Sequence, residues 1–448
     1  MLIKSLKAWR RDGESGPVRA WFACLFAGLL LSGCSTVCLE PEELCASGNA
    51  NTSLHPRASS VLAPQAPAAA PVPAAAPVPA PAPEPVDPVR TAPIYLPGQD
   101  AGAARAANPA ASPAAGTARI ALLLPLSSPS LGGAAEAVRA GFLAAAERDG
   151  AGIQVDVVPT SDNPDEALAT YARAGAAHDI VVGPLSRPAV GALIASGKID
   201  KPTVALNHPE VRGTLPPRML VAGLSIEDEA RQAAEWAARE HPHGRVLILT
   251  GSPAWAQRAA GAFEARWSEL GHTGQRFALP SSDGRVDPAL LQDLKARLEV
   301  DPPELLFAAV DVAELRQVRT FAGATLPVYG GASINPGRTP GLGATELDGI
   351  HVVDLPWLVL PDHPAVMVYP RQADPETPLY MQRLYALGID AFLVARQIAA
   401  QPGGPVGGPV RIDGVTGQLT FGADSALTRR EAAAVYRDGN FTPVEAGP

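Results

Sequence analysis

The chain has 448 residues and a formal net charge of −9 at pH 7, and proline and alanine crowd its first quarter. This acidic balance repels nucleic acid, so a polyphosphate partner is disfavoured. All four cysteines (Cys24, Cys34, Cys38 and Cys45) precede residue 46, which excludes a disulfide framework or a cysteine metal site in everything that follows.

The N-terminus has the features of a lipoprotein signal peptide. Basic residues precede the apolar stretch 20–31, which is too short to span a bilayer as a stable helix. Leu31-Ser32-Gly33-Cys34 follows and resembles the bacterial lipobox, whose cysteine thiol is acylated and becomes the first mature residue. We expect residues 1–33 to be the signal peptide and Cys34 to be the lipidation site. The alternative is an ordinary secretory signal with an incidental cysteine.

The residue after the expected lipidation site bears on the membrane to which the protein is attached. In enteric bacteria an aspartate at this position is associated with retention in the inner membrane, whereas this chain has Ser35. By that resemblance we expect a lipid anchor in the outer membrane that faces the periplasm. Two or three acyl chains anchor a protein firmly, whereas one does not.

Residues 34–117 are rich in proline and alanine and lack a helical or alternating pattern, as in Pro77-Val78-Pro79-Ala80-Pro81. Proline fixes φ and removes a hydrogen-bond donor, so we expect a disordered tether with extended polyproline II character. Roughly 70 residues at about 3.1 Å each reach on the order of 200 Å when fully stretched. Its length, more than its sequence, suits a spacer that carries a folded head from the outer membrane towards inner-membrane proteins.

From residue 118 onwards buried strands alternate with helices. Ile120–Pro125 is a continuous apolar run, and Ala135, Val138, Phe142 and Ala145 then line one helical face. Further strands are expected at 155–158, 179–184, 203–207, 245–250, 305–310 and 327–330. Further helices are expected over 163–177, 188–196, 225–240, 252–270 and from 287, and the domain closes with a helix over 378–400 and strands near 418–421.

Helix-capping patterns support these boundaries. Asn163 precedes a proline and two acids, Ser225 and Asp287 stand before helices, and Asp311 with Glu314 forms a capping box.

The repeated alternation predicts an α/β fold with right-handed βαβ units and doubly wound parallel sheets. The chain holds enough units for two lobes joined by three crossings. We expect lobe 1 near 118–223 plus part of 352–400, and lobe 2 near 224–351 plus part of the tail, within a domain that spans 118–448.

Several phrases, in order and spacing, resemble the C-terminal domain of the penicillin-binding protein activator LpoA family. After an opening typical of type I periplasmic binding proteins (Ile120–Pro125 and Val138-Arg-Ala-Gly-Phe142), they are Val181-Val-Gly-Pro-Leu185, Ala205-Leu-Asn207, Gly223-Leu-Ser-Ile-Glu-Asp-Glu-Ala230, Leu347-Asp-Gly-Ile350, Asp354-Leu-Pro-Trp357, Leu384-Tyr-Ala-Leu-Gly-Ile-Asp-Ala391 and Gly414-Val-Thr-Gly-Gln-Leu419. The resemblance implies a two-lobed type I periplasmic-binding-protein fold. Enteric members carry a helical-repeat domain where this chain has its tether, so no function of that domain is carried over.

Signatures of catalysis are missing from the sequence. Gly223-Leu-Ser-Ile-Glu227 lacks the second glycine of a nucleophile elbow, and no glycine-rich loop with a lysine cradles phosphate. The close histidine pair His241-Pro-His243 has no acidic third ligand nearby. We therefore expect no enzymatic activity, no cofactor and no bound metal.

A binding cleft is the remaining candidate site, because open α/β sheets bind ligands beyond the carboxyl ends of their strands. The corresponding loops contain Ser127, Ser128, Pro184, Leu185, Ser186, Asn207, His208, Ser252, Trp255, Ser333 and Asn335. Their hydroxyl and amide groups suit a carboxylate or an amine. The alternative interpretation is purely structural, with Ser252 as a helix cap, Asn207 as a turn former and Trp255 as a packing residue.

Two functions follow. The resemblance implies an outer-membrane lipoprotein that binds a class A penicillin-binding protein and stimulates peptidoglycan synthesis allosterically. The alternative is a solute-binding protein of a transport system, with an amino acid or a muropeptide as the small ligand in its cleft.

Overall fold

The structure is a computed structural model that describes residues 117–210, 213–339, 345–371, 376–401, 409–422 and 427–444. The expected signal peptide, Cys34 and nearly all of the expected tether lie outside these residues. Within them, no helix is both long enough and apolar enough to cross a bilayer.

Lobe 1 is built on a five-stranded parallel sheet with the order β2-β1-β3-β4-β5. Its strands are β1 (Ala118–Leu124), β2 (Ile153–Pro159), β3 (Ile180–Val182), β4 (Thr203–Ala205) and β5 (Met219–Val221). Side chains 120 to 124 of β1, an inner strand of this sheet, are fully buried. Both faces of this sheet are therefore covered, as the unbroken apolar run predicted.

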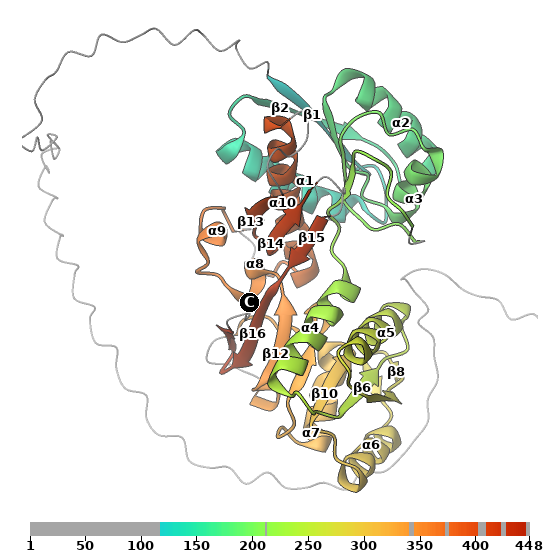
Figure 1. Ribbon diagram of the computed structural model, residues 1–448, viewed down its shortest axis with the longest axis vertical. Coiled ribbons are helices and arrows are strands. Elements are labelled where there is room, and N and C mark those ends of the chain that lie inside the picture. Colours follow the sequence, from blue (N-terminus) through green and yellow to red (C-terminus); the bar gives the residue numbers. More distant parts are fainter. Residues whose placement is uncertain are drawn as a thin grey trace, which may run out of the picture. The chain divides into compact units, whose positions relative to one another are not determined.

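Four helices cover the two faces of the lobe 1 sheet (Figure 1). They are α1 (Gly132–Asp149), α2 (Pro164–Ala177), α3 (Arg187–Ser196) and α10 (Leu379–Ala400). Ile120, Leu122 and Leu124 pack with residues of α1 and α10, whereas Ala121 and Leu123 pack with residues of α2 and α3. The alternation of side chains along a strand thus divides one apolar run between two cores.

Lobe 2 repeats this plan with a seven-stranded sheet, in the order β17-β16-β12-β11-β10-β6-β7. Its strands are β6 (Val246–Thr250), β7 (Gly274–Ala278), β10 (Leu305–Ala309), β11 (Val328–Gly330), β12 (Ile350–Asp354), β16 (Ala432–Arg437) and β17 (Asn440–Pro443). Its helices are α4 (Ile226–Glu240), α5 (Ala254–Glu269), α6 (Pro288–Val300) and α7 (Val312–Ala322). Residues of α4 and α5 line one core, and residues of α6 and α7 line the other.

The predicted α/β class with doubly wound parallel sheets is confirmed, with one departure in lobe 2. Strand β16 pairs antiparallel with β12, and β17 pairs antiparallel with β16. The chain reaches this edge from a separate antiparallel sheet of β13 (Val410–Asp413), β14 (Gln418–Phe421) and β15 (Leu427–Arg430). Strand β16 begins beside the end of β12, with Ala432 opposite Asp354, so it runs back along β12 in the antiparallel sense.

Short elements complete the described structure. They are the hairpin β8 (Ser281–Ser282) with β9 (Arg285–Val286), the 3₁₀ turns η1 (Ala332–Ile334) and η2 (Thr345–Leu347), and the short helices α8 (Pro356–Val359) and α9 (Pro364–Met367).

The predicted caps at Asn163, Ser225, Asp287 and Asp311 are all present. The Asp311 side chain accepts from the backbone of Glu314, and the Glu314 side chain accepts from the backbone of Asp311. These local contacts are readable from sequence because donor and acceptor lie within one turn.

Helices α1 and α10 cross with their backbones in close contact. A Cβ added to Gly141 would lie 1.9 Å from the carbonyl oxygen of Tyr385, and one added to Gly388 would lie 2.1 Å from that of Val138. Both clashes are with backbone, so a side chain at either position must push the helices apart. Two glycines thus fix the spacing through which α10 joins lobe 1.

We predict that Gly388→Ala destabilises the protein by about 1–3 kcal/mol, the usual cost of overpacking, even though alanine is the better helix former. Gly191→Ala in α3 is the control, because no atom lies within 4 Å of its added Cβ. This control should gain up to about 1 kcal/mol. Denaturant unfolding of both variants checks the prediction, and equal stabilities would show that the helix crossing is not tight.

Candidate functional site

In lobe 1, the loop after β1 contains the predicted residues Ser127 and Ser128. Ser127 is exposed, whereas Ser128 is buried, with 5% of its surface accessible. The Ser128 hydroxyl donates to Asp162 at 2.8 Å and accepts from the backbone N–H of Leu131 at 3.0 Å. It therefore joins the loop after β1 to the loop after β2, and its hydrogen-bonding groups are occupied by the protein itself.

The structure brings together the predicted residues that follow β3 and β4. The Asn207 side chain donates to the carbonyl of Leu185 at 3.1 Å and accepts from the backbone of His208 at 2.9 Å. Ser186 caps α3 by accepting from the backbone of Ala189. The Asn207 amide thus acts as the turn-forming group of the structural interpretation.

His208 extends this set to the segment that leaves lobe 1. Its Nε2 lies 3.1 Å from the carbonyl oxygen of Gly223, which can only accept a hydrogen bond. Burial lowers the pKa of this imidazole, which favours the neutral ring. A neutral histidine bonded to the backbone is a poor partner for a ligand carboxylate.

The predicted residues of lobe 2 are less connected. Ser252 is exposed, and Trp255 is half-buried against the core beneath α4 and α5. The expectation that Ser252 caps α5 is wrong, because Pro253 occupies the N-cap position and no side chain caps this helix. Ser333 lies half-buried in η1, and Asn335 is buried.

Asn335 is committed to two internal contacts. Its side chain donates to Asp354 at 2.7 Å and accepts from the backbone of Gly337 at 2.7 Å. No hydrogen bond between described residues links the predicted set of lobe 1 to that of lobe 2. The polar groups at these strand ends therefore mainly hold loops in place.

The site that sequence reasoning missed is a buried group of ions, here called the crossing cluster. It consists of Glu229, Asp354, Arg383, Asp390, Arg429 and Glu431. Arg383 on α10 forms ion pairs with Glu229 on α4, at 2.5 Å, and with Asp354 at the end of β12. Both carboxylates are further held by the backbone, because Glu229 accepts from Ala332 at 2.8 Å and Asp354 accepts from Leu355 at 2.6 Å.

Arg429 forms the second half of the crossing cluster. Its guanidinium donates to the carbonyls of Ala222 at 2.6 Å and Gly223 at 2.9 Å, and to the hydroxyl of Thr416 at 2.9 Å. Asp390 accepts from the backbone and the hydroxyl of Thr416, and from the backbone of Val415 at 2.9 Å. Five donors and acceptors thus converge on two buried charges.

The charges of the crossing cluster do not balance, since four carboxyl groups face two guanidinium groups. Burial raises the pKa of Glu431 well above its usual range, and the nearby Glu229 carboxylate raises it further. One Glu431 oxygen is buried without a hydrogen-bond partner among the described residues. Burial also raises the pKa of Glu229 and of Asp390. A protonated Glu431 therefore relieves part of the excess negative charge.

One sequence signal for this cluster was available. Asp390 is the single charged residue in the apolar run from Tyr385 to Ala395 of α10. An acid inside such a run is rarely buried without a partner. Its partner Thr416 is unrecognisable from sequence, because the two meet only in the folded chain.

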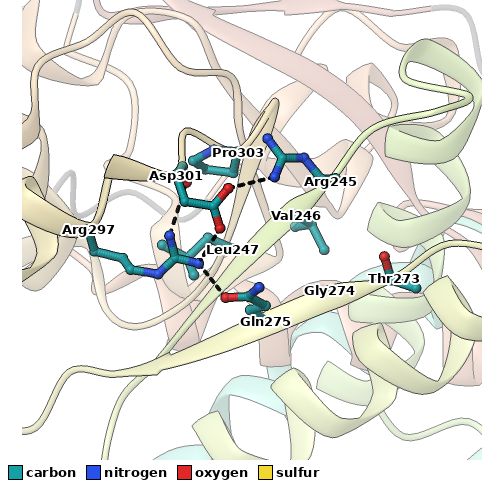
Figure 2. A pocket seen from close by; sticks show the side chains of 9 residues that line it. All are labelled: Arg245, Val246, Leu247, Thr273, Gly274, Gln275, Arg297, Asp301 and Pro303. Atoms are coloured by element: carbon teal, nitrogen blue, oxygen red, sulfur yellow. Dashed lines mark hydrogen bonds and ion pairs between the residues drawn. The ribbon is translucent and has the colours of Figure 1, made fainter. Parts of the chain in front are cut away.

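Three cavities lie elsewhere. Figure 2 shows one of about 240 Å³ at the amino ends of β6 and β7, where Arg245 and Arg297 both bond to Asp301. Both of its cations are thus paired with a carboxylate, and it lies away from the carboxyl ends of the strands. The second is lined by α1, α9, α10 and β13, and the third by α4, α5 and Arg430. Among the described residues, no three His, Cys, Asp or Glu side chains are placed to hold a metal.

We predict a pH-dependent effect of Glu431→Gln. Because the pKa of Glu431 is raised on folding, the folded protein binds this proton more tightly than the unfolded chain. The stability that the proton contributes is present below the unfolded pKa, about 4.3, and is lost as the pH rises through the raised value. Glutamine cannot ionise, so the stability of the variant relative to wild type should increase as the pH rises from about 5 to about 8.

Glu304→Gln is the control with the opposite sign. The backbone N–H of Arg245 donates to Glu304 and lowers the pKa of that carboxyl, so its stabilising effect is present above the unfolded pKa and disappears in acid. The stability of this variant relative to wild type should fall as the pH rises through the acidic range. Denaturant unfolding over a pH series measures both, and parallel profiles for Glu431→Gln and wild type would contradict a buried neutral carboxyl.

Comparison with known proteins places the fold in a family. A profile of the LppC family, provisionally described as lipoproteins, matches residues 113–439. The penicillin-binding protein activator LpoA of Haemophilus ducreyi is 28% identical over 334 residues, which cover 71% of this chain and 53% of that protein. The chain thus spans about half the length of the curated relatives that it matches first.

Two solved structures share the architecture. A Chromobacterium violaceum protein, provisionally described as a branched-chain amino acid ABC transporter, is 34% identical with a TM-score of 0.60, over 71% of this chain and all of that one. The C-terminal domain of Haemophilus influenzae LpoA, described as a regulator of PBP1A, is 23% identical with a TM-score of 0.55, over 73% of this chain and all of that one. The chain therefore belongs to the LppC family, and its described part has the type I periplasmic-binding-protein fold of the LpoA C-terminal domain.

Proposed function

We propose that the chain is an outer-membrane lipoprotein whose head binds a class A penicillin-binding protein and stimulates peptidoglycan synthesis. The family match over residues 113–439 carries this proposal, because the curated relatives within it are named as penicillin-binding protein activators. The relatives are thus named as regulators and not as enzymes. We propose the same for this chain, without a catalytic centre, cofactor or metal of its own.

The strand-end loops support a head that acts by contact. An amino-acid receptor needs free donors and acceptors that converge on the ligand. Here Ser128, Ser186, Asn207, His208 and Asn335 instead bond to side chains and backbone of the protein itself. A surface that touches a partner does not need such a polar pocket.

Stimulation requires the head to bind two states of the synthase with different affinities. If the head binds the active state more tightly, its binding shifts the population towards that state by the ratio of the two affinities. A factor of 10 in rate needs a difference of about 1.4 kcal/mol, which a few surface contacts supply. The head therefore needs a defined binding surface and does not need catalytic residues.

The N-terminal segment would carry this head from the outer membrane to the synthase. Acylated Cys34 would fix one end in the outer membrane, residues 34–117 would span the periplasmic space, and the domain over 118–448 would reach the synthase. Lobe 1 would comprise 118–223 with part of 352–400, and lobe 2 the region 224–351 with part of the tail.

The anchor is tested by Cys34→Ala, with Cys38→Ala as the matched control. We expect Cys34→Ala to abolish labelling by radioactive palmitate and to remove the protein from the outer-membrane fraction, because only a thiol at the lipobox position accepts the diacylglyceryl group. Cys38→Ala should be labelled like wild type. Labelling that persists in Cys34→Ala would contradict the assignment of the lipidation site.

The function is tested with the purified full-length chain and class A synthases. We expect an affinity pull-down to retain one of them, and glycan polymerisation by that synthase to rise when the chain is added. A class B penicillin-binding protein, which lacks the glycan-polymerising domain, serves as the control for specificity. Neither binding nor stimulation with any class A synthase would refute the proposal.

The second candidate is a solute-binding protein, which the 34% identity to the Chromobacterium violaceum protein favours. This function predicts a different outcome in the same preparation. A ligand at 100 times its Kd stabilises a protein by about 2.7 kcal/mol, so leucine, isoleucine, valine or muropeptides would raise the melting temperature. An unchanged melting temperature with all of them agrees with the activator proposal.

A further inference from the structure

The chain passes between the two lobes at three crossings, and each of them contacts the crossing cluster. The first crossing follows β5 at 222–225, the second follows β12 at Leu355, and the third lies at Glu431 between β15 and β16. Arg429 binds the first crossing through two carbonyls, and Asp354 accepts the backbone N–H of the second. The third crossing carries Glu431 itself, whose N–H donates to Gln232 at 2.9 Å.

The bonds of the crossing cluster connect one lobe to the other. Helix α10, which carries Arg383, packs in the lobe 1 core, whereas α4, which carries Glu229, packs in the lobe 2 core. The Arg383–Glu229 ion pair is therefore a contact between lobes, with side-chain exposures of 12% and 3%. Asp354 ends a strand of the lobe 2 sheet and pairs with the same arginine.

The two halves of the cluster share their supporting helices. Helix α10 supplies Arg383 to one half and Asp390 to the other. Helix α4 supplies Glu229, and it also supplies Gln232, which contacts the backbone of Arg429 and Glu431. A shift of either helix therefore disturbs both halves.

Close backbone contacts leave little room for water in the cluster. A Cβ added to Gly331 would lie 2.5 Å from a carboxylate oxygen of Glu229, and one added to Gly414 would lie 2.4 Å from one of Asp390. Such a buried, hydrogen-bonded group of ions resists opening, because breaking one bond leaves a buried charge unpaired.

Hinge closure needs crossings whose φ and ψ angles are free to change. Here the first crossing is bonded to Arg429, the second to Asp354, and the third to Gln232 on α4. We infer that the crossing cluster clamps the three crossings into one cooperative unit, so that the two lobes act as a single body and do not open and close about the crossings. This inference is independent of the proposed function.

Residue-resolved hydrogen–deuterium exchange of the full-length chain tests the clamp. The probes are the backbone amides of Ala222, Leu355 and Glu431, one at each crossing, which all donate hydrogen bonds. In the wild type we expect similar protection at all three, because a cooperative unit opens as a whole. Protection at one crossing with rapid exchange at another would overturn the inference without any variant.

Arg429→Lys tests the coupling between the two halves. Lysine keeps the charge but lacks the planar fork that holds the carbonyls of Ala222 and Gly223 together. We expect exchange to rise at least about tenfold at all three probes, including Leu355, which Arg429 does not touch. A rise confined to the first crossing would show separate contacts and no clamp.

Two further variants complete the test. Arg383→Lys breaks the other half and should loosen Ala222 as well as Leu355. Arg276→Lys is the control, because it alters an exposed ion pair with Glu264 on the surface of lobe 2. In this variant the amides of all three crossings should exchange as in wild type. If Arg429→Lys fails to fold, Arg383→Lys provides the same test. In that variant, faster exchange at Ala222, which Arg383 does not contact, would support the clamp, and unchanged exchange there would contradict it.

Discussion

The five-stranded sheet of lobe 1 and the seven-stranded sheet of lobe 2 are each covered on both faces, and most of the structure depends on that constraint. A parallel strand that is apolar on both sides must have helices above and below it, so β1 divides its side chains between the α1/α10 core and the α2/α3 core. The same plan recurs around β6 and β10 in lobe 2.

At the strand ends, polar side chains form hydrogen bonds that hold the loops in place. Ser128, Asn207 and Asn335 each bond to a neighbouring loop, which keeps these edges ordered without an external ligand. The chain has a type I periplasmic-binding-protein fold, while these three side chains at its strand ends are bonded within the protein. A surface of fixed shape is what a regulator that acts by contact requires, because its binding energy must distinguish two states of its partner.

At the crossings the polar groups are ionic and buried, which is energetically demanding. Burying a carboxylate is tolerated only with several hydrogen bonds or a cation. Glu229 and Asp354 each have an arginine and a backbone N–H as partners, and Asp390 accepts several hydrogen bonds. One Glu431 oxygen has no hydrogen-bond partner among the described residues, and burial together with the nearby Glu229 carboxylate raises the pKa of Glu431. Because folding raises the pKa of Glu431, the stability of the protein depends on pH.

The sequence alone determined the features whose physical causes are local. The strand and helix periods of β1 and α1, the caps at Asn163 and Ser225, and the capping box at Asp311 all arise from contacts within a few residues, so the pattern of residues predicts them. The positions of the strand-end loops followed from the fold class, although the prediction of Ser252 as a cap failed because Pro253 takes that position.

Three features depend on contacts that form only in the folded chain. They are the antiparallel pairing of β16 with β12, the packing of α10 on α1 at Gly141 and Gly388, and the crossing cluster. The cluster residues lie far apart in the sequence, on α4, β12, α10 and the segment around β15. They come into contact only when the two lobes pack together, and no periodicity in the sequence indicates which of them will pair. The apolar run around Asp390 indicates that a buried charge needs a partner, but the partner is set by the fold.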